Sequence, residues 1–314
     1  MPARYTLGID IGGTTTALAV IDAQNHVARE RRFPTKAEAG FESVLLRIGE
    51  AAAPALERYP CAAVGVAVAA HVDPRTGILV TSPNLGFENV PLGAVVQEEF
   101  NLPAVVENDV NAAAFAEYLA DPTAREPLLA VFVGTGVGGG LVVDGDVFRG
   151  ADGFAAEIGH VPVVAEGGEP CGCGRRGCVE AYAGGRAIVR RASARCRGKA
   201  AFDDVGAVAR AAEAGERGCA DVLEEAAAYL GVALAAAVNL LNPGTLVIGG
   251  GVARAWPALG ERALERMRRS ALPASLARLA TRGAILGERA GLIGAAALAR
   301  RRSAPGPSRG RRAP

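Results

Sequence analysis

The chain has 314 residues, of which 50% are hydrophobic and 21% are charged, and its formal net charge is +1. The length fits one large or two medium domains, and the apolar content excludes a chain that is disordered throughout. The small net charge excludes an overall electrostatic field that would draw the protein to nucleic acid or to an anionic membrane.

The N-terminus, MPARYTLGID, leads directly into a strand-like run, so no signal peptide is expected. The run that comes nearest to a membrane span is 226–241, but Asn239 and the Asn242-Pro243 pair favour a buried helix. Six cysteines in a chain of this kind indicate reduced thiols that serve a metal. We therefore expect a cytoplasmic protein without a membrane segment.

The first lobe, residues 1–120, is predicted to be an α/β structure, because strand patterns alternate with helical ones. Apolar residues at helical spacing predict a helix over 41–57. Asn108-Asp109 ends the last strand of the lobe, and a helix is expected to begin near Val110. The strands are predicted at 5–11, 16–22, 26–34, 62–69 and 103–107.

A linker-like stretch from Asp121 to Pro127 opens a second lobe, 121–287, which begins in the same way. A strand is predicted at 128–133, and a glycine-rich turn and a second strand follow at 134–140 and 141–144. Because both halves open with strand, glycine turn and strand, we expect a duplicated α/β unit with a cleft between the copies. The remaining predictions are helices at about 186–197, 203–214, 219–241, 256–270 and 288–302, a strand at 245–249 and a disordered tail at 303–314.

Three bare-backbone turns lie at predicted strand ends. They can present N–H groups to phosphate oxygens, because glycine has no Cβ to hold a ligand away. The first turn, DIGGTTT, adds threonine hydroxyls and a carboxylate that can hold Mg²⁺ directly or through water, although an ordinary hairpin turn is the alternative. The candidate nucleotide-binding residues are Asp10, Gly12, Gly13, Thr14, Thr15, Gly134, Thr135, Gly136, Gly249, Gly250 and Gly251.

The second turn, GTGVGGG, matches the pattern G-x-G-x-x-G at Gly134, Gly136 and Gly139. A dinucleotide-binding fold needs a helix at this point, whereas the sequence that follows, LVVDGDVF, predicts a strand and a hairpin turn. We therefore reject a Rossmann fold, and the absence of GxxxxGK[ST] excludes a P-loop enzyme. Together, the turns and the duplicated unit favour binding of a nucleoside triphosphate.

Asn108 and Asp109 stand at a strand end, where a carboxylate can face the cleft. Phosphoryl transfer needs a group that orients the acceptor hydroxyl and accepts its proton, and Asp109 is the candidate for this catalytic role. Both residue types are also good helix N-caps, so a capping role is equally open, and one residue can do both.

The stretch from Glu157 to Glu180 holds one imidazole and three thiols, spaced His-x10-Cys-x-Cys-x4-Cys. Four nitrogen and sulfur ligands are what a structural Zn²⁺ needs for a closed tetrahedral site, and the glycines between the cysteines allow a tight loop. Whether the metal only stabilises the loop, or also positions groups that bind a polar ligand, is open at this point. The predicted ligands are His160, Cys171, Cys173 and Cys178.

These motifs resemble the ROK family (repressor, open reading frame, kinase), a branch of the actin-like ATPase and sugar kinase superfamily. The resemblance covers about residues 5 to 300 and is most specific in GTGVGGGLVVDGDVFRGADGFAAEIGHVPV and CGCGRRGCVEAYAGG. DIGGTTT, SPNLGF, ENDVNAAA and NPGTLVIGGGV match as well. The resemblance implies a two-lobed fold of duplicated ribonuclease H-like units, with a cleft between the lobes and a final helix, at about 288–302, that returns to the first lobe.

The resemblance also implies an ATP-dependent kinase that uses Mg²⁺ to phosphorylate the 6-hydroxyl of a hexose, as glucokinases do in glycolysis. Asp109 matches the catalytic base of the family. His160 would serve both the zinc ion and the sugar, through its two ring nitrogens. A homodimer is implied as well. The residues that match sugar ligands of the family are Asn84, Asn108, Asp109, Glu157, His160 and Glu180.

The sequence departs from the family pattern at several positions. Ala69-Ala70-His71 stands where the family often has a Pro-Gly pair in a loop that borders the sugar, so this departure bears on which sugar is bound. Thr15 replaces a usual lysine, Ala156 replaces the glycine before the acid of the ExGH motif, and Gly184 replaces a frequent serine.

The leading hypothesis is a glucokinase that works with ATP and Mg²⁺ and carries a structural Zn²⁺. The alternatives are a kinase for another hexose or N-acetylhexosamine, such as N-acetylmannosamine, N-acetylglucosamine or fructose, and a non-catalytic sugar sensor. A sugar-responsive transcription factor would need a helix-turn-helix before the first glycine turn, and only seven residues precede Gly8. We expect sugar and ATP as partners, and no nucleic acid.

Overall fold

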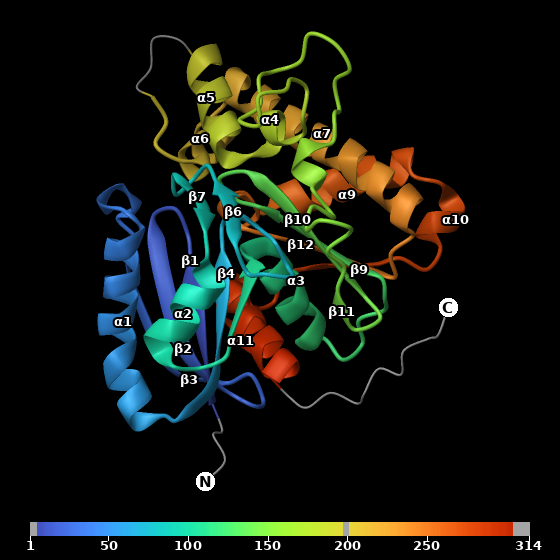
Figure 1. The fold of residues 1–314 in the computed structure, drawn as a ribbon. Coiled ribbons are helices and arrows are strands. Elements are labelled where there is room, and N and C mark those ends of the chain that lie inside the picture. The colour runs from blue at the N-terminus through green and yellow to red at the C-terminus, as the bar shows by residue number, and fades with distance from the viewer. Residues whose placement is uncertain (1–4, 197–200, 304–314) are drawn as a thin grey trace. The chain divides into compact units, whose positions relative to one another are not determined.

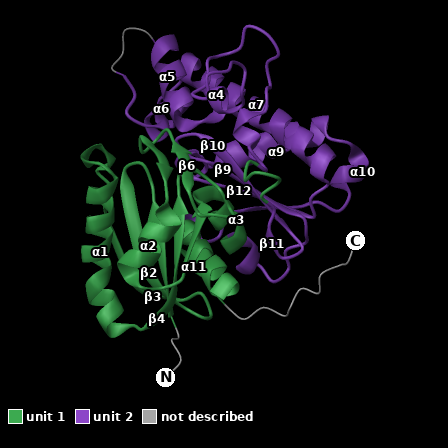
Figure 2. Cartoon of the chain, in the orientation of Figure 1, with its two compact units in different colours: residues 1–116, 149–154, 289–314 green, residues 117–148, 155–288 purple. Residues whose placement is uncertain are grey.

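Figure 1 shows the chain as a computed structural model, which describes residues 5–196 and 201–303. The chain divides into two compact units, which Figure 2 colours separately. Among the described residues, unit 1 comprises 5–116, 149–154 and 289–303, and unit 2 comprises 117–148, 155–196 and 201–288.

Unit 1 is built on a five-stranded sheet in the order β3-β2-β1-β4-β8, beside a three-stranded sheet β5-β6-β7. In the larger sheet β1 is antiparallel to β2 and parallel to β4, and β8 continues the parallel part. The elements are β1 Tyr5–Ile11, β2 Thr15–Asp22, β3 Val27–Pro34, α1 Phe41–Arg58, β4 Cys61–Val68, β5 His71–Val72, β6 Leu79–Ser82, β7 Phe87–Val90, α2 Leu92–Phe100, β8 Ala104–Asn108, α3 Asp109–Leu119 and α11 Ala290–Ser303, with a short 3-10 helix at Ala37–Ala39. The last three residues of α3 already belong to unit 2.

The two faces of β1 have different neighbours, because side chains alternate along a strand. Leu7 belongs to a buried cluster that includes Ile48 of α1. Gly8 faces α11, and a Cβ on Gly8 would come within 2.5 Å of Leu292 O. Every residue of α11 from 290 to 299 is buried, as expected for a helix enclosed on all sides. Glycine therefore sets how closely this helix approaches the sheet.

Unit 2 repeats the arrangement with a sheet in the order β11-β10-β9-β12-β13. Residues of α5, α6, α7 and α9 form one buried cluster with β9 and β12. The elements are β9 Leu128–Val133, β10 Val137–Val143, β11 Asp146–Val147, a 3-10 helix Ile158–His160, α4 Glu180–Ala183, α5 Gly185–Arg195, α6 Val205–Glu213, α7 Arg217–Leu241, β12 Thr245–Gly249, α8 Gly251–Ala255, α9 Ala258–Ser270, α10 Pro273–Leu276, β13 Ala280–Gly283 and a 3-10 helix Gly287–Arg289.

The two larger sheets share one topology. In each, a three-stranded antiparallel meander is followed by two parallel strands, so the predicted duplication of an α/β unit is confirmed. In unit 1, Ile11 of β1 is opposite Val68 of β4, and Val68 is opposite Asn108 of β8. The C-terminal ends of these parallel strands therefore meet at one edge of the sheet, which is where ligands bind in open α/β sheets.

One predicted turn is wrong in its extent. The stretch 134–140 is a turn only as far as Gly136, because β10 begins at Val137 and pairs with β9, with Gly139 opposite Val131. A Cβ on Gly139 would come within 2.4 Å of Ala156 O, so the glycine marks a close backbone approach inside a strand rather than a turn. The predicted strand 141–144 is the second half of β10.

Other predicted elements are present with small shifts, except that the helix predicted at 256–270 begins at Ala258 and is preceded by the separate helix α8. The sequence did not predict α2, α4, α8, α10, β5, β6, β7, β11 or β13. The predicted tail 303–314 lies outside the described residues apart from Ser303, which is the last residue of α11. The lobe boundaries at 120/121 and 287/288 stay a prediction.

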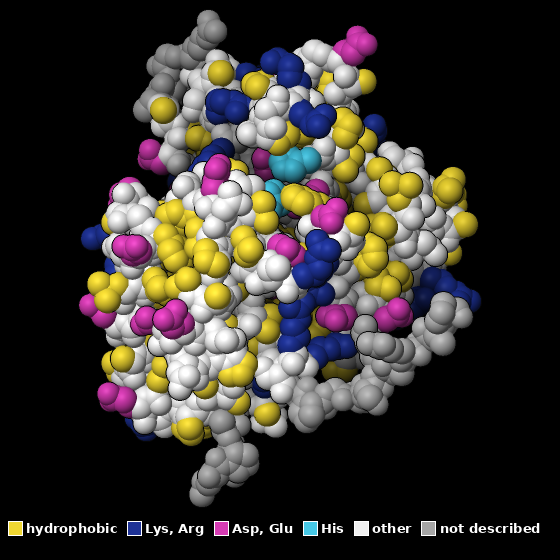
Figure 3. All heavy atoms as spheres, viewed as in Figure 1, with side chains coloured by type: hydrophobic (Ala, Val, Ile, Leu, Met, Phe, Trp, Pro, Cys, Tyr) yellow, Lys and Arg dark blue, Asp and Glu magenta, His cyan; other side chains and the backbone are white. Residues whose placement is uncertain are grey.

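The surface carries charges of both signs. Acidic and basic side chains are interspersed on the face that Figure 3 shows, in keeping with the net charge of +1. None of the helices in the described ranges is both long and apolar enough to pass through a membrane.

Candidate active site

The first glycine turn joins β1 to β2 in unit 1 and is held by hydrogen bonds. Gly12 N donates to Thr15 O over 3.1 Å, and Thr35 Oγ1 donates to Gly12 O over 2.7 Å. Both threonines that follow Gly13 are exposed. A Cβ on Gly13 would come within 3.4 Å of Asn84, so the turn lies against the segment that carries this predicted sugar ligand.

Asp10 is the next-to-last residue of β1 and lies close to α11, where a Cβ on Gly291 would come within 2.5 Å of Asp10 Oδ2. The pKa of Asp10 is raised to about 7, first by burial and then by the Asp109 carboxylate, against the opposing charge of Arg32. Two carboxylates that repel each other are favourable for a divalent cation, because the cation removes the repulsion. Asp10 therefore fits the predicted role of holding Mg²⁺.

Asn108 and Asp109 divide the capping of α3 between them. Asn108 Oδ1 accepts hydrogen bonds from the N–H groups of Val110 and Asn111, at 2.9 and 3.0 Å, which makes Asn108 the principal cap. Asp109 Oδ1 accepts from Asn108 Nδ2 at 3.1 Å and from Val110 N at 3.0 Å. One carboxylate oxygen of Asp109 is thus oriented by its neighbours, and capping does not depend on Asp109 alone.

The loop that departs from the family pattern contacts these residues. Asn108 Nδ2 donates to Ala70 O over 3.2 Å. The His71 ring lies 4.6 Å from the ring of Phe154, at an angle of 40°. Ala70 therefore helps to fix Asn108, and His71 contacts a residue three positions before Glu157.

The second glycine turn, 134–136 in unit 2, is fixed by α5 and by Glu180. Gly185 N donates to the first carbonyl of the turn over 2.9 Å, and Val137 N donates to Glu180 Oε2 over 3.0 Å. A Cβ on Gly136 would lie only 2.2 Å from the same carboxylate oxygen. With alanine at position 136, the Glu180 carboxylate would have to move away from the turn.

Glu157 follows a residue in an unfavourable conformation. Ala156 has a φ of 63°, in the left-handed region that residues with a Cβ avoid. Ile158 N donates to Ala156 O over 2.6 Å, and Gly139 leaves space for that carbonyl. The glycine usual in the family at position 156 would adopt this conformation without strain.

The four predicted metal ligands are brought together, and their ligand atoms all lie within 4.8 Å of one another. His160 Nδ1 is 3.7 Å from Cys171 Sγ, and Cys173 Sγ is 3.8 Å from Cys178 Sγ. Zn–S bonds of about 2.3 Å in a tetrahedron separate the sulfurs by about 3.8 Å, so the arrangement fits Zn²⁺.

Without a metal ion, the Cys171 thiol of this cluster holds its proton, so a bound cation is needed to stabilise its thiolate form. Burial is the main cause that raises the pKa of the Cys171 thiol to about 12, and the charge of the Glu180 carboxylate, whose Oε1 lies 3.6 Å from Cys171 Sγ, contributes to the rise. Thiolates are the form that binds zinc, so metal binding would release protons from these cysteines. Because Nδ1 of His160 faces the sulfurs, Nε2 is the ring nitrogen left for another partner.

The third glycine turn, Gly249–Gly251, lines a cavity of 720 Å³ in unit 2. Gly250 has a φ of 100°, and a Cβ on it would come within 2.3 Å of Val133 O, so the position requires glycine. Arg254, Glu261, Leu264 and Arg268 also line the cavity, which is within the size range of small-molecule sites. The nucleotide role of this turn stays a prediction.

The predicted site residues fall into two groups. Unit 1 holds Asp10, Gly12, Gly13, Thr14, Thr15, Asn84, Asn108 and Asp109, and unit 2 holds Gly134, Thr135, Gly136, Glu157, His160, Cys171, Cys173, Cys178, Glu180 and Gly249–Gly251. Within unit 1 the carboxylates of Asp10 and Asp109 interact, and within unit 2 Glu180 links the second turn to the metal ligands. The roles of these residues stay predictions.

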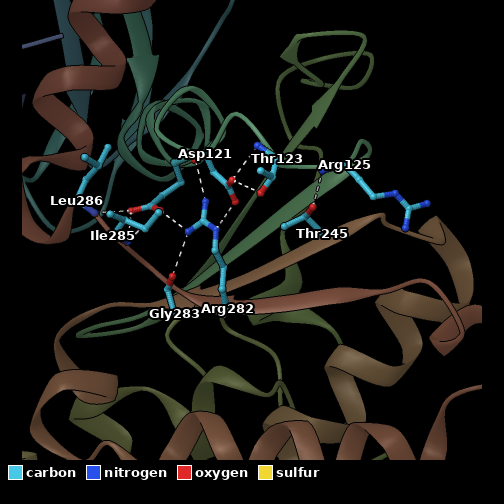
Figure 4. A network of polar contacts seen from close by, with 9 residues as sticks. Asp121, Thr123, Arg125, Thr245, Arg282, Gly283, Ile285 and Leu286 are labelled. Carbon is cyan, nitrogen blue, oxygen red and sulfur yellow. Dashed lines mark hydrogen bonds and ion pairs between the residues drawn. The ribbon is translucent and has the colours of Figure 1, made fainter.

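A buried carboxylate that the sequence analysis missed lies in the last turns of α3. Glu117 is fully buried and accepts hydrogen bonds from Arg282 Nη1 at 2.7 Å and from the N–H groups of Ile285 and Leu286. Arg282 also binds Asp121, as Figure 4 shows. The network fixes the C-terminal end of α3, and the signal for it was a single acid inside the apolar run AAAFAEYLA.

The chain is similar to proteins of known family over nearly its whole length. The model of the ROK family matches residues 6–302. A glucokinase of Halalkalibacterium halodurans is 32% identical over 311 residues, which cover 94% of this chain and 94% of that protein. An N-acetylmannosamine kinase of Citrobacter koseri is 34% identical over 298 residues, which cover 94% of this chain and 98% of that protein.

A solved structure has the same fold. The ROK family glucokinase from Streptomyces griseus, in complex with glucose and AMPPNP, superposes with a TM-score of 0.82 at 33% identity, covering 95% of this chain and 99% of that chain. The predicted fold class, a duplicated α/β fold of the actin-like ATPase type, is confirmed.

Proposed function

Because the chain belongs to the ROK family, we propose that it is a hexose kinase that transfers the γ-phosphoryl group of ATP to the 6-hydroxyl of glucose. The similarity to a glucokinase and to a glucokinase structure extends over nearly the whole chain and supports this proposal. The proposed reaction yields glucose 6-phosphate and ADP.

The observation that carries the proposal is a pair of interacting carboxylates at one edge of the sheet in unit 1. Asp10 is the next-to-last residue of β1, Asp109 begins α3, and the charge of Asp109 raises the pKa of Asp10. The glycine turn that follows Asp10 offers main-chain N–H groups and exposed hydroxyls. A cation-binding carboxylate, a phosphate-binding turn and a proton acceptor are the parts that phosphoryl transfer needs.

In the proposed mechanism, Asp109 orients the sugar hydroxyl and accepts its proton as the oxygen attacks the γ-phosphorus and the bond to the β,γ-bridging oxygen breaks. Asn108 keeps Asp109 in place through the 3.1 Å hydrogen bond to Oδ1. The N–H groups of the glycine turns hold the phosphate oxygens and stabilise the charge that develops there. Mg²⁺ bound at Asp10 would neutralise charge on the β- and γ-phosphates.

We assign Zn²⁺ to His160, Cys171, Cys173 and Cys178, and sugar contacts to His160 Nε2 and Glu180. The support is the 3.6 Å distance between Glu180 Oε1 and Cys171 Sγ, which places this carboxylate beside the metal ligands. When bound, zinc would fix the loop and hold the imidazole in one orientation. Asn84, Asn108 and Glu157 are assigned to the remaining sugar hydroxyls.

The test is an ADP-release assay with ATP and Mg²⁺ against a panel of hexoses and N-acetylhexosamines. We expect sugar-dependent turnover with the highest kcat/KM for glucose. Asp109→Asn should fold and still bind sugar but lose about 10²–10⁴-fold in kcat, which is the usual contribution of a general base. Near-normal turnover of a folded Asp109→Asn protein would exclude the proposed role.

N-acetylmannosamine is the second candidate acceptor. Ala69-Ala70-His71 stands where the family often has a Pro-Gly pair in the loop that borders the sugar, and Ala70 O accepts a hydrogen bond from the predicted sugar ligand Asn108. The same assay decides, because a higher kcat/KM with N-acetylmannosamine than with glucose would assign the protein to that reaction. Sugar binding by calorimetry without turnover of any sugar would indicate a sensor instead.

We also propose that the protein is a cytoplasmic homodimer, as its family resemblance implies. Light scattering after size-exclusion chromatography would measure the mass, and a monomer of 32.0 kDa would contradict the dimer.

A further inference from the structure

Residues 149–154 form a strap that belongs to unit 1, although the chain on both sides of it belongs to unit 2. Arg149 begins the strap, and Glu157, a predicted sugar ligand, follows its end by three residues. The strap is therefore a piece of chain that leads from contacts in unit 1 directly to the sugar-binding segment.

The strap is anchored by an ion pair with Glu107. Arg149 Nε lies 2.6 Å from Glu107 Oε2, and the side chains of Arg149 and Glu107 are only 12% and 5% exposed. An ion pair so far removed from water is screened little by solvent, and the bond is charge-assisted. Asp152 makes a weaker contact, since it lies 3.9 Å from Arg75 and both side chains are largely exposed.

Glu107 also organises the predicted catalytic residues. It is the next-to-last residue of β8, two positions before Asp109. Glu107 Oε1 accepts hydrogen bonds from Asn108 N at 3.1 Å and from Asn111 Nδ2 at 3.2 Å. One buried carboxylate thus holds the strap with one oxygen and the start of α3 with the other.

We propose that Glu107 and Arg149 are a positioning pair for the phosphoryl transfer, because one buried ion pair holds the strap 149–154 against the segment of Asp109. This inference rests on the proposed kinase activity. Neither residue contacts the reacting atoms, and both act through the residues that they hold. Proximity effects make such positioning important, because a misplacement of about 1 Å can cost about 10²-fold in rate.

The test compares Glu107→Gln/Arg149→Met, Arg149→Lys and the control Asp152→Asn. The double variant removes both charges, so no buried charge is left without a partner and the protein is expected to fold. We expect its kcat/KM for the best sugar to fall at least about ten-fold, with a lower kcat and a higher KM. The kcat/KM of Arg149→Lys should lie between those of the double variant and the wild type, because lysine keeps the positive charge. The kcat/KM of Asp152→Asn should equal that of the wild type.

Amide hydrogen exchange gives a second measurement that does not need activity. We expect faster exchange over 149–160 and around Asp109 in the double variant, with no change in Asp152→Asn. Wild-type kcat/KM together with wild-type exchange in the double variant would overturn the proposal. If the wild type phosphorylates no sugar, the proposed function fails, and the exchange measurement alone decides whether the pair positions both segments. Should the double variant not fold, Arg149→Lys is compared with the wild type and Asp152→Asn in the same two measurements, and a smaller loss in the same direction is expected.

Discussion

Replacing Gly136 with alanine would test whether Glu180 must lie where the structure places it. The φ of Gly136 lies outside the left-handed region, so the backbone accepts alanine and only space is at issue. The new Cβ would be 2.2 Å from Glu180 Oε2, which already accepts a hydrogen bond from Val137 N. Glu180 Oε1 lies 3.6 Å from Cys171 Sγ, so the carboxylate has little freedom to move toward the metal ligands.

The size of the effect follows from the overlap. A carbon and an oxygen that are not bonded need a separation of about 3.2 Å, so the carboxylate must move by about 1 Å. A displacement of this size can cost about 10²-fold, which corresponds to about 2.7 kcal/mol of lost interaction. We expect the loss in kcat/KM for the sugar, mainly as a higher KM, because Glu180 is assigned to bind the sugar and not to transfer the proton.

The assay combines steady-state kinetics with calorimetric titration of the sugar in the absence of nucleotide. Gly134→Ala is the matched control, since a Cβ on Gly134 meets no atom within 4 Å. The Gly134→Ala control should bind sugar with the affinity of the wild type, and any change should be seen in the KM for ATP. Sugar affinity of Gly136→Ala equal to that of the control would refute the assignment of Glu180 to the sugar.

Three further predictions concern the strained residue, the cation-binding carboxylate and the metal ligands. Ala156→Gly should stabilise the fold by about 0.5–1 kcal/mol, because it removes a left-handed alanine at φ 63° and gives back part of the gain as backbone entropy; a lower melting temperature than that of the wild type would contradict this. The folded pKa of Asp10, about 7, lies above its ordinary value of 3.8, so the metal-free native state binds the extra proton between these pH values. The free energy of unfolding of the metal-free protein should therefore fall by roughly 2–3 kcal/mol from pH 5 to 8, while the affinity for Mg²⁺ rises over the same range. Urea titrations of the wild type and Asp10→Asn at several pH values measure this, and an equal dependence of the free energy of unfolding on pH in the two proteins would exclude it. Cys178→Ser should lower the zinc content below one ion per chain and raise the KM for sugar, whereas Cys61→Ser, outside the cluster, should change neither in metal analysis and kinetics.

The sequence by itself determined the features that depend on neighbouring residues. Apolar strand-like runs on either side of a glycine turn predicted β1 and β2, and apolar residues at helical spacing predicted α1. The spacing from His160 to Cys178 predicted a ligand cluster that the structure brings within 4.8 Å. In each case the physical cause, whether backbone geometry or the reach of a short loop, acts over a short stretch of chain.

Only the tertiary structure decided the features that depend on distant partners. Gly138, Gly139 and Gly140 form a strand because hydrogen bonds to β9 outweigh the low strand propensity of glycine. The principal cap of α3 is Asn108 rather than Asp109, a choice that their adjacent positions left open. Glu107 and Arg149 are 42 residues apart in the chain, and no local pattern relates them. Their ion pair exists because folding brings the strap to the end of β8 and removes both charges from water.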